Sequence, residues 1–144
     1  MAMNLDTRRA KDVMTKVVVS VGPDDTVVEA LGMMADYHIT VLPVVDNKNR
    51  CVGILSTTDL VDPARWRNGE TIDSDNSSIR DKKVCELMTA DVESVKRESP
   101  IVNVAGTMLR QRIHHLPVVD ENQQLLGILS TMDLLAAFSN VHDQ

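Results

Sequence analysis

One seven-residue stretch that carries reactive groups appears twice in the chain, as "GILSTTD" at residues 53–59 and "GILSTMD" at residues 127–133. Each copy puts two hydroxyls and a carboxylate directly after a short apolar run, at the predicted start of a helix. A Ser and an Asp three residues apart fit a capping box, which is a purely structural role. The same groups also fit a ligand site. There the carboxylate would accept two hydrogen bonds from the hydroxyls of a ribose, while the Ser or Thr hydroxyl and the helix N-terminus would face a phosphate.

An internal repeat surrounds the two stretches. When residues 13–60 are aligned with residues 87–134 without a gap, 21 of the 48 positions are identical. "VMT" aligns with "LMT", and "ITVLPVVD" aligns with "IHHLPVVD". A repeat of this quality indicates two copies of one supersecondary unit.

The elements of each copy follow from its hydrophobic pattern. Apolar residues at helical spacing predict an amphipathic helix from Asp24 to Tyr37, with a counterpart around residues 101–109. The apolar runs "VLPVVD" and "CVGILS", separated by the polar "NKNR", predict a strand, a turn and a second strand, and "ENQQ" is the corresponding turn of the second copy. Short strands are expected before these elements, at 17–21 and 92–95. Helices are expected after them, from Thr57 to about Arg65 and from Thr131 to about Ser139.

The predicted organisation is therefore a mixed α/β fold made of two strand-helix-strand-strand-helix units. We place them at residues 8–65 and 82–140, joined by a polar, turn-rich linker at 66–81. Three strands with two helices on one side bury too little surface to be stable alone, which explains why the unit comes as a pair.

Composition excludes several classes of function. The formal charge is −6 with a pI near 5.1 and only three aromatic residues, which disfavours nucleic-acid binding. No apolar run is long enough to span a bilayer, and the N-terminus lacks the apolar core of a signal peptide, so we expect a cytoplasmic protein without a membrane partner. Cys51 and Cys85 form no CxxC-type pair, and Cys51 is interpreted as a small buried hydrophobe rather than a disulfide or metal ligand.

The arrangement "DVMT…LPVVD…GILSTTDL" followed by "ELMT…LPVVD…GILSTMDL" resembles a tandem pair of cystathionine β-synthase (CBS) domains, a Bateman module. The resemblance covers nearly the whole chain and implies a stand-alone pair with pseudo-two-fold packing. It further implies a regulatory adenosine ligand (AMP, ADP, ATP or S-adenosylmethionine) in the cleft between the repeats, with no catalytic cofactor. The ligand would act as a signal to an unidentified regulated protein, and two such pairs would form a homodimer.

The resemblance also assigns roles to residues. It implies ribose binding by Asp59 and Asp133. The candidates for phosphate contacts are Ser56, Thr57, Ser130, Thr131, Arg112 and His114. The candidates for an apolar adenine pocket are Val18, Ile39, Pro43, Val92, Ile113 and Pro117.

The two copies differ in their basic residues. His38 replaces Arg112 and Thr40 replaces His114, which puts strong phosphate binding by the first copy in doubt. Arg112 could equally be a solvated cation that complements a helix C-terminus.

Two other classes of function were weighed. A pure interaction module would keep the fold and the dimer but bind no ligand. An enzyme would need a nucleophile motif, a paired general base or a metal-ligand cluster, and the sequence has none of these. His114 and His115 cannot readily share one metal, because neighbouring strand residues face opposite sides. We therefore expect no metal site and no enzymatic activity.

Overall fold

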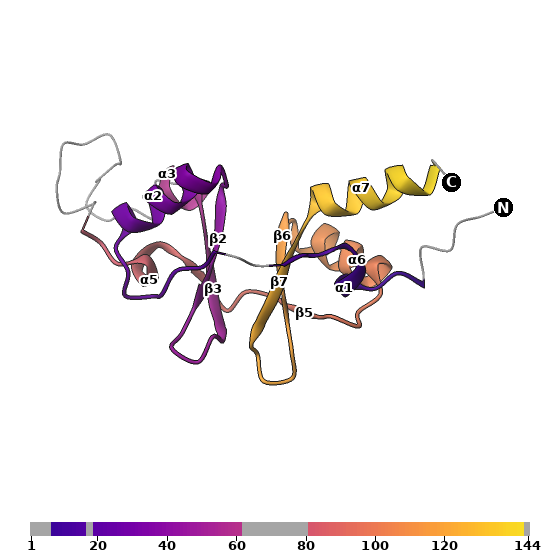
Figure 1. Ribbon diagram of the computed structural model, residues 1–144, viewed down its shortest axis with the longest axis horizontal. Helices are drawn as coiled ribbons and strands as arrows, with labels where there is room; N and C mark the ends of the chain where they lie inside the picture. The colour runs from indigo at the N-terminus through magenta and orange to yellow at the C-terminus, as the bar shows by residue number, and fades with distance from the viewer. Residues whose placement is uncertain (1–6, 17–18, 62–80, 143–144) are drawn as a thin grey trace. The chain divides into compact units, whose positions relative to one another are not determined.

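The computed structural model describes residues 7–16, 19–61 and 81–142 (Figure 1). The chain divides into two compact units. The first unit runs from Val19 to Val92 and contains the first copy of the repeated stretch. The second unit combines the N-terminal segment, up to Val18, with the chain from Glu93 onward.

Among the described residues, the two units share most of their elements, and the second has one additional strand, β5 (Figure 1). The first unit has α2 (Val27–Tyr37), β2 (Val41–Val45), β3 (Cys51–Ser56), α3 (Thr57–Val61), α5 (Val84–Leu87) and β4 (Thr89–Ala90). The second has α1 (Ala10–Val13), β1 (Thr15–Lys16), β5 (Val95–Lys96), α6 (Ile101–Gln111), β6 (His115–Val119), β7 (Leu125–Ser130) and α7 (Thr131–His142). The mixed α/β class predicted from the sequence is confirmed.

The sheets show that the short segment at the start of each repeat pairs with the strands of the other repeat. In the first unit, β3 lies between β2 and β4, with antiparallel pairing on both sides. In the second unit the order is β1-β7-β6-β5, and β5 is parallel to β6. Thus α1 and β1 begin the first repeat in sequence but complete the second unit, while α5 and β4 begin the second repeat and complete the first unit. The division of the chain into two sequence repeats therefore differs from its division into two compact units.

The amphipathic helices form as expected, except at one end. We predicted that the first begins at Asp24, but α2 begins at Val27, because Thr26 has extended backbone and its hydroxyl accepts a hydrogen bond from Glu29 N at 3.2 Å. Asp25 instead closes the preceding turn by accepting from Gly22 N at 2.7 Å.

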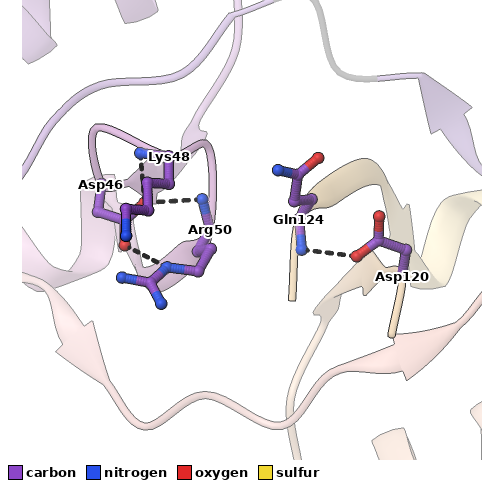
Figure 2. A network of polar contacts seen from close by, with 5 residues as sticks. All are labelled: Asp46, Lys48, Arg50, Asp120 and Gln124. Atoms are coloured by element: carbon purple, nitrogen blue, oxygen red, sulfur yellow. Dashed lines mark hydrogen bonds and ion pairs between the residues drawn. The ribbon is translucent and has the colours of Figure 1, made fainter. Parts of the chain in front are cut away.

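The two hairpins are closed by equivalent aspartates (Figure 2). Asp46 Oδ1 accepts hydrogen bonds from Lys48 N and Arg50 N, both at 2.9 Å, while its Oδ2 lies 2.7 Å from Arg50 Nε. These bonds, the one from Arg50 N foremost, hold the pKa of Asp46 below its usual value. In the second unit, Asp120 Oδ1 accepts from Asn122 N at 2.8 Å and from Gln124 N at 2.9 Å. The predicted polar turns are confirmed as side-chain-stabilised turns.

Each unit has its own apolar core. In the first it consists of Val21, Val27, Ala30, Met34, Leu42, Val44, Leu55, Leu60, Val84 and Leu87. In the second it consists of Ala10, Ile101, Val104, Met108, Leu116, Val118, Leu129, Leu134 and Ala137. Most members correspond through the repeat, and the equivalents Ala10 and Val84 each enter the core formed by the other repeat.

The expectations for the early strands and the helix ends are confirmed only in part. Within the described residues, the early strands are represented by β5 and by a parallel bridge between Val21 and Val44, while residues 17–18 lie outside the described part of the chain. Helix α7 extends past the expected Ser139 to His142. Val18, the helix end near Arg65 and nearly all of the linker at 66–81 lie outside the described residues. Within the described ranges, none of the helices combines the length and the apolar character that crossing a membrane requires.

Candidate functional site

Asp59 lies at the junction of β3 and α3 and is 8% exposed. Its Oδ2 accepts hydrogen bonds from Ser56 N at 2.9 Å and from Ser56 Oγ at 3.1 Å, and its own N–H donates to Ser56 Oγ at 3.4 Å. The second carboxylate oxygen, Oδ1, accepts from the hydroxyl of Thr89 in β4 at 3.4 Å. One oxygen therefore caps the helix, while the other faces the strand contributed by the other repeat.

Asp133 repeats this geometry at the junction of β7 and α7. Its Oδ2 accepts from Ser130 N at 2.8 Å, and its N–H donates to Ser130 Oγ at 3.0 Å. Thr15, in β1, donates to Oδ1 at 3.5 Å. The capping box is thus present in both copies. Oδ1 of Asp133 accepts a long hydrogen bond from Thr15 and has lone pairs that can accept another.

The first residues of these helices are tied to the preceding strand regions. Thr57 N donates to Thr40 O at 2.9 Å, and Thr131 N donates to His114 O at 3.0 Å. Ser56 Oγ also lies 2.7 Å from the hydroxyl of Thr58, a contact that Met132 cannot make in the second copy. Several donors predicted to face a phosphate therefore already have internal partners.

The repeated glycines have a structural explanation. A Cβ on Gly53 would lie 2.7 Å from Met88 Sδ and 2.9 Å from Thr89 O. A Cβ on Gly127 would meet Met14 Sδ at 2.7 Å and Thr15 O at 2.8 Å. In both units the glycine lets the Met-Thr segment approach the strand closely, and this segment carries the threonine that contacts the aspartate.

Three of the predicted phosphate contacts lie elsewhere in the second unit. Arg112, His114 and Thr131 line a largely apolar groove of about 580 Å³ between α6 and α7, together with residues such as Leu135 and Phe138. Asp133 and Ser130 are not among the residues that line it. Arg112 is the C-cap of α6, as the helix-end interpretation expects, with a left-handed φ of 54°. The structure therefore brings Ser130 and Asp133 together, and gathers Arg112 and His114 in the groove.

Most of the candidates for an adenine pocket are buried or pack against the cores. Pro43 and Pro117 are buried within β2 and β6. Ile39 and Ile113 are partly buried and pack against the cores of the first and second units. Val92 is half-buried at the end of the first unit.

His115, which we did not predict as a site residue, lies within electrostatic range of Asp133. It is the first residue of β6 and pairs in register with Ser130. Burial lowers its pKa, as does the neighbouring His114, while the charge of Asp133 acts in the opposite direction. Alternation along the strand predicted that His114 and His115 face opposite sides, but the sequence did not show which side holds Asp133. Thr15 and Thr89 were missed for another reason, since a two-residue strand has no recognisable period.

With this geometry in place, comparison with known proteins identifies the family. The sequence profile of the CBS domain matches residues 10–63 and 84–140, which are the two repeats. The chain belongs to the CBS-domain family. As a tandem CBS protein it has the same fold as solved CBS pairs, and the fold predicted from its repeat is confirmed.

Three similar proteins illustrate the family. Inosine-5′-monophosphate dehydrogenase of Methanocaldococcus jannaschii is 35% identical over 130 residues, which are 89% of this chain but only 23% of that protein. The structure of CBSX2, from Arabidopsis thaliana, in complex with AMP has a TM-score of 0.77 at 26% identity, covering 92% of this chain and 97% of that one. The CBS domain pair of protein MJ0100, in complex with 5′-methylthioadenosine and S-adenosyl-L-methionine, has a TM-score of 0.75 at 25% identity, covering 93% and 98%.

Proposed function

We propose that this tandem CBS protein is a regulatory module that binds an adenosine ligand and signals its presence to another protein. The observation that carries the proposal is the aspartate at the start of α3 and of α7. In both units one carboxylate oxygen caps the helix, while the other faces a threonine from the opposite repeat. A carboxylate held in this way is suited to accept hydrogen bonds from the vicinal hydroxyls of a ribose.

The relatives support the class of ligand. Both solved CBS pairs described above were crystallised with adenosine compounds, AMP in one case and S-adenosylmethionine with methylthioadenosine in the other. The dehydrogenase activity of the M. jannaschii relative is not proposed for this chain, because the match covers less than a quarter of that enzyme. AMP, ADP, ATP and S-adenosylmethionine are therefore the candidate ligands, acting as signals rather than as catalytic cofactors.

Within this proposal Asp59 and Asp133 bind ribose. Ser56, Thr57, Ser130 and Thr131 provide polar groups at the helix starts. Because Arg112 and His114 line the α6–α7 groove, their phosphate role rests on the family resemblance and requires its own test. A location in the cytoplasm, and the identity of the regulated protein, also stay predictions.

We also infer a homodimer. Leu109, Leu135 and Phe138 line the groove between α6 and α7, and their side chains are 80%, 58% and 42% exposed. A contiguous apolar surface of this kind is typical of an interaction site. A second copy is the proposed occupant, because two-fold homodimers are the commonest closed assemblies.

A ligand screen tests the nucleotide proposal. The melting temperature is measured with AMP, ADP, ATP, NAD and S-adenosylmethionine, and the affinity of any stabilising ligand is then determined by calorimetric titration. A ligand present at 100 times its dissociation constant should stabilise the native state by about 2.7 kcal/mol. If none of these ligands binds at millimolar concentration while the protein is folded and dimeric, the ligand-free interaction module is the correct interpretation.

A further inference from the structure

We propose that His115 makes nucleotide binding at the Asp133 site dependent on pH, by contacting the ligand's phosphate in its protonated form, and that the Asp59 site lacks this dependence. The inference deepens the proposed function and rests on it. It assigns a proton-linked contact to one of two sites that share the same arrangement of Ser, Asp and Thr.

His115 lies on the same face of the sheet as the capping box. Residues that lie directly opposite in an antiparallel pair have side chains on the same face of the sheet, and His115 is opposite Ser130. Ser130 directs its hydroxyl toward Asp133 N, at the start of α7. His115 therefore shares a sheet face with the capping box, whereas its neighbour His114 lines the groove between α6 and α7.

The charged groups near the His115 imidazole come from the start of β6, from α7 and from the neighbouring strands. The titratable groups that act on His115 are His114, adjacent in the chain, and Asp133, at the start of α7. In β1, the Thr15 hydroxyl donates a hydrogen bond to the same carboxylate. The exposed Lys16 is in register with Gly127, which precedes Ser130 in β7. In β5, Lys96 Nζ donates a hydrogen bond to Asp120 O, which lies just after the other end of β6. Within the described part of the chain, no hydrogen bond holds the imidazole, so it can contact a ligand without breaking one.

The two units differ at the position of His115. Val41 occupies the equivalent position in the first unit, where it pairs in register with Ser56. The capping box and the threonine contact are otherwise the same. The first unit therefore has the same carboxylate geometry with a valine in place of this imidazole, and it serves as a comparison site.

The direction of the pH effect follows from linkage. In the unliganded protein, burial lowers the pKa of His115, so the ring is mostly neutral at neutral pH. An anionic phosphate beside the ring favours the protonated form and raises the pKa in the complex. Binding then takes up a proton, and affinity rises as pH falls toward the pKa of the unliganded site. If binding raises the pKa by about one unit, affinity is about tenfold higher below both pKa values than above both.

The experiment isolates each site and uses AMP as the probe. Asp59→Asn leaves the Asp133 site for measurement, and Asp133→Asn leaves the Asp59 site. AMP affinity is measured calorimetrically at about pH 8 and about pH 6, which brackets the titration of histidine. AMP itself gains a proton near pH 6, an effect common to both sites, so the first unit supplies the correction.

We expect the ratio of affinities at about pH 6 and about pH 8 to be several-fold larger for the Asp133 site than for the Asp59 site, approaching about tenfold only as the pH falls below the lowered pKa of the unliganded ring. In the Asp59→Asn background, His115→Val reproduces the residue of the first unit and should abolish the difference. His115→Gln retains a polar side chain without the charge and should abolish it as well. Thermal melting without ligand confirms that each variant is folded.

The outcomes distinguish a failure of the role proposed for His115 from a failure of nucleotide binding itself. If both sites bind AMP with the same pH dependence, the role of His115 is wrong and the nucleotide function stands. The same conclusion follows if either His115 variant retains the larger dependence. If neither site binds AMP at any pH, the inference fails together with the AMP site on which it rests.

Discussion

Thr15 and Asp133 are 118 positions apart in the chain, yet the Thr15 hydroxyl lies 3.5 Å from Asp133 Oδ1. Thr89 and Asp59 form the equivalent pair, at 3.4 Å. In each pair the threonine lies near the start of one repeat, and the aspartate lies near the end of the other repeat. The "MT" and "GILST" motifs are therefore two halves of one structural feature, and this explains why the chain carries both of them twice.

The first prediction concerns Asp133→Asn. Asparagine keeps the shape and can still accept the hydrogen bond from Ser130 N, but it removes the charge. Hydrogen bonds to charged groups contribute about 1.5–3 kcal/mol, so nucleotide affinity at this site should fall by roughly ten- to a hundredfold. Stability without ligand should fall by less than about 1 kcal/mol, because Asn is also a competent cap. Titration calorimetry and thermal melting on the same protein measure both effects.

Asp59→Asn is the companion variant and reports on the first unit. A parallel loss of affinity would show that both sites are occupied. An aspartate that serves only as a helix cap would give the opposite pattern in both variants, with lower stability and unchanged affinity.

The sequence predicted the elements with regular periods better than the short ones. Val27 and Met34 are buried on one face of α2, as their spacing indicates, and the strand-turn-strand pattern of each copy is confirmed. The exchange of the Met-Thr segments could not be predicted, because a pairing between short strands far apart in sequence leaves no periodic signal. The repeat places a glycine at residue 53 and again at residue 127, but only the structure shows the close backbone approach at both positions.

A second prediction tests this close approach with Gly127→Ala. The new methyl group would lie 2.8 Å from Thr15 O, which is backbone and cannot move without shifting β1. We expect a loss of about 1–3 kcal/mol in the free energy of unfolding. The control is Gly32→Ala. Gly32 is exposed in α2, and its Cβ would meet nothing within 4 Å, so stability should rise by about 0.5–1 kcal/mol. Denaturant unfolding compares the two, and equal effects would contradict the packing role.

A third prediction concerns the two thiols, both of which are free. Cys85 is exposed, whereas Cys51 is half-buried and donates to Gly53 O at 3.6 Å. Burial raises the pKa of Cys51, which lowers the fraction of reactive thiolate at neutral pH. Ellman's reagent should therefore modify Cys85 first in the native protein and both thiols in denaturant. Mass spectrometry of the partly labelled protein identifies the site, and preferential labelling of Cys51 would contradict its burial.

The last prediction tests the proposed dimer at the α6–α7 groove. Leu135 lines this groove and is 58% exposed, so it can be replaced by glutamate with little effect on the core of its own unit. A buried charge at an apolar interface should weaken association by at least about tenfold. Val102→Glu is the matched control, since Val102 is 48% exposed on α6 but is not among the groove residues. Sedimentation velocity at micromolar concentrations should show dimers for the unmodified protein and for Val102→Glu, and monomers for Leu135→Glu. A strictly monomeric unmodified protein would refute the homodimer, and a Leu135→Glu protein that stays dimeric would place the interface on another surface.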